Sequence, residues 1–247
     1  MIRTLALIAA VSFVLCIGAI AASLAIAGGP FFVGEDFRVH HWSWSGGFNH
    51  HHARWASHVH GPQTARTFTW SGGDQLAVDL PADVTFTQGP TTTLIIHGSK
   101  DALDQVVVHG GQIDYRPGVY DGERLQIELT APDVRRFELN GDQVLKLAGY
   151  KQDRLDLSIN GAAKVSGAGS AAKVSLDISG SGDADLAALA VDDAAITISG
   201  SGSVALAAKG AVKVDVSGSG DVRLLNRPRS LETDISGSGH VTQPATL

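Results

Sequence analysis

Hydrophobic and polar residues alternate with a period of two through much of the second half of the chain. The segments DISGSGDADL from Asp177 and DVSGSGDVRL from Asp215 place apolar residues at every second position on either side of a glycine-serine stretch. Such alternation is typical of a strand with one buried and one exposed face. We therefore predict β-structure from about residue 137 to the C-terminus.

The alternating segments recur at a nearly fixed interval. The glycine after the Ser or Asn of each unit marks the repeat, and successive markers are 20, 19, 20, 18 and 19 residues apart: Gly141, Gly161, Gly180, Gly200, Gly218 and Gly237. This period indicates a solenoid, whose units bury their apolar faces only by stacking on their neighbours. Asp183–Ala195 alone would fit an Ala-rich helix, but its register with the other units predicts a strand. The sequence therefore predicts an all-β fold, a parallel β-helix of about 19-residue coils with SGSG at a tight corner.

The repeated corners resemble those of a known family. The copies of SGSG preceded by Asp-Ile or Asp-Val, and the upstream segments RTF from Arg66, ADVTFTQG from Ala82 and LIIHG from Leu94, are similar to the DUF2807 family, also called the putative auto-transporter adhesin, head GIN domain. The resemblance covers about residues 64–243. It implies a right-handed β-helix in an exported envelope domain.

Residues 64–136 precede the repeat array and differ from it in pattern. They contain longer predicted strands and a short helix over Lys100–Val107, for which Ser99 is the predicted N-cap. We expect this region to cap one end of the β-helix, within a domain that spans residues 64–247. The opposite, C-terminal end is a candidate face for self-association, because an unpaired strand edge invites pairing.

The first 27 residues are predicted to be a signal peptide or a membrane-anchor helix. No charged residue occurs from Thr4 to Gly34, and Arg3 supplies the positive N-terminal end. The apolar stretch is long enough to cross a bilayer, which takes about 20 residues. Ala25-Ile26-Ala27 also fits signal peptidase, so cleavage after Ala27 and retention in the inner membrane both remain open. We expect an exported protein of the periplasm or cell envelope, whose N-terminal segment engages the membrane.

Residues 28–63 form a His/Trp-rich stretch that we interpret as a linker. It contains seven of the ten histidines, namely His40, His41, His50, His51, His52, His58 and His60. Imidazole is a common metal ligand, but the spacing matches no closed tetrahedral site and no cysteine or carboxylate cluster completes one. We predict no metal or cofactor here. A metal-binding or envelope-sensing role of residues 40–60 is the alternative function.

Acidic residues occupy equivalent places around the repeated corners and form the main candidate constellation. Asp177, Asp215 and Asp234 precede the corners, whereas Asp183 and Asp221 follow them. Stacked carboxylates repel one another and are able to recruit Ca²⁺. However, Ser158 and Thr197 interrupt the first row, and Ser203 and His240 interrupt the second. We therefore interpret these residues as solvated side chains and predict no metal site.

Catalysis is not expected. The serines lie at repeated corner positions, and the sequence contains no G-x-S-x-G motif. Irregular residues able to converge on a groove are few, and we interpret both groups, Tyr150–Arg154 and Asn226–Arg229, as exposed turns. A polysaccharide-active enzyme is the lesser alternative, because some β-helices carry such activity.

Charge excludes one class of partner. The formal net charge is −6 and the chain has no basic run, whereas a nucleic-acid surface needs clustered Lys and Arg. We therefore expect a non-enzymatic, adhesin-like binding module, whose rows of Ser, Thr and Asp suit an envelope glycan or protein ligand.

Overall fold

The structure of the protein is a computed structural model that describes residues 63–118 and 122–245. The predicted leader and, apart from Gln63, the His/Trp-rich linker with all seven of its histidines lie outside the described residues. No helix among the described residues is long and apolar enough to cross a membrane.

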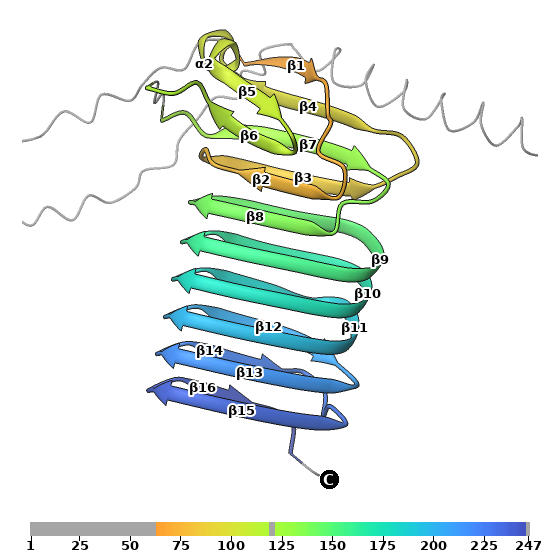
Figure 1. The fold of residues 1–247 in the computed structure, drawn as a ribbon, viewed down its shortest axis with the longest axis vertical. Coiled ribbons are helices and arrows are strands. Elements are labelled where there is room, and N and C mark those ends of the chain that lie inside the picture. Colours follow the sequence, from red (N-terminus) through yellow and green to blue (C-terminus); the bar gives the residue numbers. More distant parts are fainter. Residues whose placement is uncertain (1–62, 119–121, 246–247) are drawn as a thin grey trace, which may run out of the picture. The chain divides into compact units, whose positions relative to one another are not determined.

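Strands from residue 136 onward stack as parallel coils, as Figure 1 shows. One ladder, here called the front ladder, joins β8, β9, β10, β11, β13 and β15. The other, here called the back ladder, joins β3 (Ala82–Gln88) to β9, β10, β11, β12, β14 and β16. The long strands β9, β10 and β11 contribute to both ladders. The bounds are β8 Arg136–Gly141, β9 Gln143–Gly161, β10 Lys164–Gly180, β11 Asp183–Gly200, β12 Ser203–Ala208, β13 Ala211–Gly218, β14 Asp221–Leu224, β15 Ser230–Gly237 and β16 His240–Thr242. The predicted parallel β-helix is confirmed.

Steric crowding by the neighbouring coil explains why both glycines of each SGSG corner lack a side chain. Gly200 has a φ of +138°, and a Cβ built on it would lie 2.2 Å from the carbonyl oxygen of Gly180 in the coil above. The second glycine of that corner, Gly202, points inward, where a Cβ would lie 2.9 Å from Cγ2 of Ile178. Between them, the backbone N–H of Ser201 donates to Gly180 O at 2.8 Å. Only residues without a side chain allow the corners to stack this closely.

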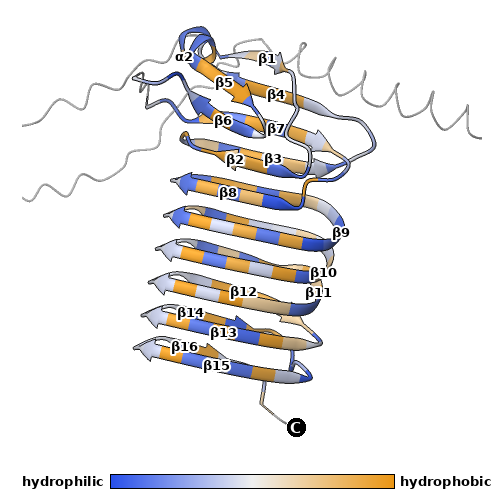
Figure 2. Cartoon of the chain, in the orientation of Figure 1, coloured by the Kyte–Doolittle hydropathy of each residue, from blue (hydrophilic) through white to orange (hydrophobic). Residues whose placement is uncertain are grey.

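The core is a series of inward-facing aliphatic rows. At one level the front ladder places Leu139, Ile159, Ile178, Ile198 and Val216 in register, and all five are at most 2% exposed. The alternation of apolar and polar residues along each strand is visible in Figure 2. Asp183–Ala195, the helix-like segment, lies in β11 as its register predicted.

The N-terminal cap begins as two further parallel layers. Strands β2 and β3 stack directly on β8 and β9, and β6 and β7 stack on β2 and β3. The antiparallel strands β4, β5 and β1 then end the parallel stacking. The bounds are β1 Thr64–Phe68, β2 Gln75–Val78, β3 Ala82–Gln88, β4 Thr93–Gly98, α2 Lys100–Gln105, β5 Val106–His109, β6 Gln112–Tyr115 and β7 Leu125–Ala131.

The short helix of the cap is shorter than predicted. Its N-cap is Ser99, whose hydroxyl accepts from Ala102 N at 3.2 Å. It ends at Gln105 rather than Val107, because the β-branched residues that follow pair antiparallel with β6. Glu123, which is 2% exposed, fixes this start: its carboxylate accepts from the backbone N–H of Ser99 at 2.8 Å and from the Ser99 hydroxyl at 2.5 Å.

Candidate binding surface

The outer side of the front ladder presents three polar rows that run down the stacked coils. The register of β8, β9, β10, β11, β13 and β15 aligns them, and neighbouring members lie about 4.8 Å apart in the direction of stacking. The corner row contains Asn140, Asn160, Ser179, Ser199, Ser217 and Ser236; the middle row contains Glu138, Ser158, Asp177, Thr197, Asp215 and Asp234; the outer row contains Arg136, Asp156, Ser175, Ala195, Lys213 and Glu232.

The corner and middle rows carry mostly short polar groups on a regular sheet. The side-chain amide of Asn160 donates to Asn140 Oδ1 at 2.8 Å, so the top of the corner row is internally bonded. Below it the serine hydroxyls of the same row are exposed. A hydroxyl both donates and accepts, and a carboxylate only accepts. The surface therefore offers a repeated set of hydrogen-bonding groups to a ligand that lies along the coils.

The predicted acidic rows lie in register, and neighbouring side chains contact several of their carboxylates. Asp215 is a register partner of Asp234. Lys213 Nζ lies 3.4 Å from Oδ2 of Asp215. On the back ladder, the Ser203 hydroxyl donates to Asp183 Oδ1 at 2.5 Å, and His240 Nδ1 lies 3.5 Å from Asp221 Oδ1. Within residues 63–118 and 122–245, no three His, Cys, Asp or Glu side chains meet in an arrangement that would hold a metal ion.

A groove of about 490 Å³ runs beside the outer row. Its second wall is the row two residues earlier on each strand, here called the rim row: Arg154, Lys173, Asp193, Ala211 and Ser230. Halfway down, the small side chains of Ser175, Ala195 and Ala211 line it. Charged side chains of both signs surround this hollow.

The end of the groove nearest the cap carries two cations side by side. Arg154 and Lys173 are register partners on β9 and β10, and like charges directly opposite one another are unfavourable. Arg154 Nε contacts Asp156 Oδ1 at 2.7 Å, a hydrogen bond that raises the pKa of the guanidinium above its ordinary value. The other register partner of Lys173 is Asp193, whose Oδ1 instead accepts from the backbone N–H of Ala211 at 2.8 Å.

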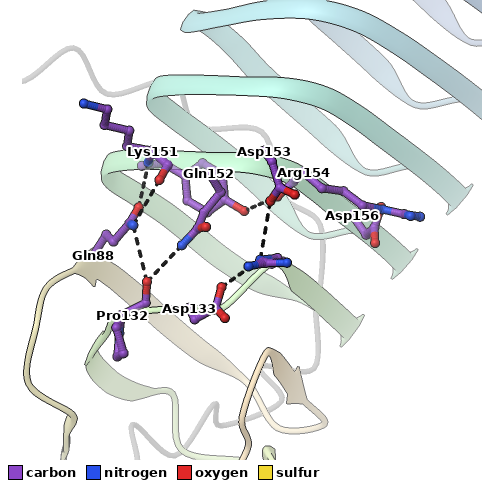
Figure 3. Close-up of polar contacts among 10 residues, drawn as sticks. Gln88, Pro132, Asp133, Lys151, Gln152, Asp153, Arg154 and Asp156 are labelled. Carbon is purple, nitrogen blue, oxygen red and sulfur yellow. Dashed lines mark hydrogen bonds and ion pairs between the residues drawn. The ribbon is translucent and has the colours of Figure 1, made fainter.

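Contacts with the cap hold the turn of β9 that leads into the groove, as Figure 3 shows. The Gln88 side chain accepts from Lys151 N at 2.6 Å and donates to Lys151 O at 3.0 Å. Gln152 Nε2 donates to Pro132 O at 2.9 Å. Arg135 Nε lies 2.7 Å from Asp133 Oδ1 and 3.5 Å from Asp153 Oδ1. These contacts fix where Arg154 leaves the turn.

The interpretation of Tyr150–Arg154 as an exposed turn is wrong, because all five residues lie within strand β9 and Tyr150 is buried. That side chain is fully buried and packs edge-to-face against Phe86 and Phe137, with ring centroids 6.3 Å from each. Its hydroxyl donates to Arg154 O at 2.7 Å, and burial raises the pKa of the phenol. Asn226–Arg229 does form a turn between β14 and β15, although its Pro228 is buried.

Comparison with known proteins relates this fold to one family. The model of DUF2807, described as "Putative auto-transporter adhesin, head GIN domain", matches residues 74–228. The crystal structure of a putative adhesin from Bacteroides fragilis is 16% identical, with a TM-score of 0.59 over 73% of this chain and 96% of that chain. A putative adhesin from Parabacteroides distasonis is 17% identical, with a TM-score of 0.50 over 73% and 96% of the two chains. At sequence identities this low, the likeness to these two structures shows only that they share the fold. No curated protein matches the chain.

Proposed function

Because the chain belongs to the DUF2807 family, whose model matches well over half of it, we propose that it is a non-enzymatic, exported binding module of the cell envelope. The observation that carries this proposal is the outer side of the front ladder. Its corner row repeats short Asn and Ser side chains from coil to coil, and its middle row repeats Ser, Thr and carboxylate side chains. A repetitive ligand, such as an envelope glycan, or an extended protein segment would meet equivalent hydrogen-bonding groups at each coil.

The chemistry of this surface favours binding over turnover. General acid-base catalysis on a glycan needs two carboxyl groups that face each other across the scissile bond. Here the carboxylates lie in stacked rows on one side of a sheet, and Asp215 and Asp156 have basic partners at 3.4 Å and 2.7 Å. The apolar N-terminal segment supports export, and it would keep the module at the membrane or release it into the envelope.

The proposal is tested by binding of the purified full-length chain to fractionated envelopes of the source cell. We expect saturable binding that the double variant Ser199→Arg/Ser217→Arg abolishes, because two long cations then cover the corner row. The control is Ser166→Arg/Ala187→Arg, which places the same charges at exposed positions outside the front ladder. Equal binding by both variants, or release of cleaved glycan during the incubation, would overturn the proposal.

A further inference from the structure

We propose that the C-terminal end of the coil stack is an interface between two copies of this chain, with β15 of one copy paired to β16 of the other. This interface goes beyond the proposed function, because it uses the end of the stack and not the outer side of the front ladder. Figure 1 shows β15 and β16 as the last coil of the stack, and no further strand follows them within residues 63–118 and 122–245.

The last coil has one edge to which no strand is paired. Within the described part of the chain, β15 pairs only with β13, and β16 pairs only with β14. Residues 243–245, which follow β16, are exposed and form no strand. An unpaired edge presents a row of backbone N–H and C=O groups to any strand that approaches it. This coil therefore lacks the neighbour that the coils above it have.

The inward apolar rows also end uncovered at this coil. Ile235 is 39% exposed, whereas its register partner Val216 in the coil above is 2% exposed. Leu231 and Val241 are only partly buried, although the residues above them in the same rows are buried. Elsewhere in the stack the next coil supplies the cover. The last coil of a second copy has the same spacing of apolar residues and would supply it here.

Two such ends can meet with two-fold symmetry in two ways, and charge disfavours one of them. In the first, β15 pairs antiparallel with β15 of the second copy. The two longest registers that keep Ile235 facing inward place either Glu232 opposite Asp234 or Asp234 opposite its own symmetry mate. Both carboxylates are exposed, and like charges directly opposite one another destabilise a strand pair. This arrangement is therefore unfavourable.

In the second arrangement β15 pairs with β16, and the symmetry itself sets the register. A two-fold axis parallel to the strands exchanges the front and back ladders between the copies. The chain turns back at the corner, so β15 and β16 run in opposite directions and pair antiparallel across the interface. Ile235 and Val241 each stand three residues from Ser238, at the middle of the corner. The axis therefore places Ile235 of one copy opposite Val241 of the other.

The neighbouring pairs of this second arrangement contain no like charges. Ser236 lies opposite His240, and Asp234 lies opposite Thr242. Each pair joins a hydroxyl to a side chain with which it is able to form a hydrogen bond. Because both copies present the same surface, every pair occurs twice and association closes at a dimer.

The test is sedimentation equilibrium of the full-length chain in detergent. A single coil is a narrow surface, of the weak class that buries less than about 1,200 Å², so we expect dimers only at concentrations on the order of 10 µM and above. Ile235→Lys should weaken dimerisation at least about tenfold, because two charges would be buried at the interface. The matched control is Val144→Lys: Val144 is 38% exposed on the back ladder, and this variant should dimerise like the wild type.

Cross-linking tests the register independently of these variants. In a Cys16→Ser background, chains carrying Ser236→Cys are mixed with chains carrying His240→Cys and oxidised. The mixture should form a disulfide-linked dimer, because opposite residues of an antiparallel pair have Cα atoms about 4.5–5.5 Å apart. Either chain alone should form much less of it. Circular dichroism of each variant at low concentration, where all should be monomeric, checks that the fold is retained.

A wild type that stays monomeric well above 10 µM, as an order of magnitude, would overturn the proposal. Equal weakening by Ile235→Lys and Val144→Lys, or faster cross-linking of Ser236→Cys alone than of the mixture, would do the same. If Ile235→Lys lost envelope binding without any change in self-association, a different partner would cover this end. The proposed function is read separately, from the effect of Ser199→Arg/Ser217→Arg on envelope binding.

Discussion

At the scale of single residues, the corner glycines make the sharpest prediction. Gly200→Ala should destabilise the fold, because a residue forced into an unusual positive-φ conformation costs on the order of 1–3 kcal/mol. The 2.2 Å approach of the new Cβ to Gly180 O adds to that cost. Urea unfolding at equilibrium would measure the loss.

The matched control is Gly73→Ala. Gly73 also has a positive φ, +57°, but a Cβ there would meet nothing within 4 Å. We expect this variant to lose only about 1 kcal/mol, the cost of the left-handed conformation for an L-residue. An equal loss at both sites would mean that stacking of the corners imposes no steric demand.

The buried phenol of Tyr150 should make the folded chain less stable at alkaline pH. Burial raises its pKa above the ordinary value of 10.0, so the folded chain holds the phenolic proton more tightly than the unfolded chain. This contribution is complete below pH 10 and declines as the pH rises above it. Tyr150→Phe should cost about 0.5–1.5 kcal/mol at pH 8, since the hydrogen bond to Arg154 O is lost.

Above pH 10 the unfolding free energies of wild type and Tyr150→Phe should converge. The wild type loses stability as its unfolded phenol ionises, whereas Phe has no proton to lose. Unfolding free energies of both chains at pH 8 and pH 11 give this comparison, in which the titration of other groups cancels. A difference between wild type and Tyr150→Phe that stays constant or grows from pH 8 to pH 11 would contradict the assignment.

At the scale of elements, residues at equivalent positions on different strands should contribute unequally to the stability of the fold. Ile198 on β11 and Ile235 on β15 occupy the same inward row, yet Ile198 is 0% exposed and Ile235 is 39% exposed. Ile198→Ala should cost about 2–5 kcal/mol. Ile235→Ala should cost about 1 kcal/mol, because less apolar surface is buried. Equal losses in thermal or urea unfolding would show that β15 is covered in solution.

The strands of the repeat array could be predicted from the sequence because the same pattern of alternating residues and corner glycines recurs in every unit. Asp183–Ala195 has a helix-like composition, but its distance from the marker glycines assigned it correctly to a strand. The parallel layer of β2 and β3 was missed, since neither strand is followed by SGSG, although both stack on the repeat. In the first coil Gln143 occupies the position of the second corner glycine and donates to Val78 O and Leu80 O of the cap.

The groove was also missed, although its signal is present in the sequence. Arg154 and Lys173 each stand seven residues before a marker glycine, Gly161 and Gly180, and this equal spacing makes them register partners. The interpretation of Tyr150–Arg154 as an irregular turn obscured that alignment. Burial of Tyr150 depends on Phe86 of the cap, a contact distant in sequence that no local pattern reveals.

At the scale of the whole molecule, a solenoid should tolerate removal of a complete coil. Its stability is approximately a sum over units and their interfaces. Gly180 and Gly200 are 20 residues apart and in register, so deletion of residues 181–200 joins Gly180 to Ser201 at an equivalent corner. Strands β12 and β13 would then stack on β10, with every inward row continuous.

We expect this deleted chain to fold with the cap intact, and with a smaller urea m-value because less surface is exposed on unfolding. It should lose the groove, since Asp193 and Ala195 are removed and Lys213 moves one coil nearer to Lys173. Deletion of residues 191–200 alone is the control, because half a coil directs the chain to the wrong ladder. Circular dichroism and urea unfolding compare the two. If both deletions folded equally well, or neither folded, the coil would not be the structural unit on which the binding surface is built.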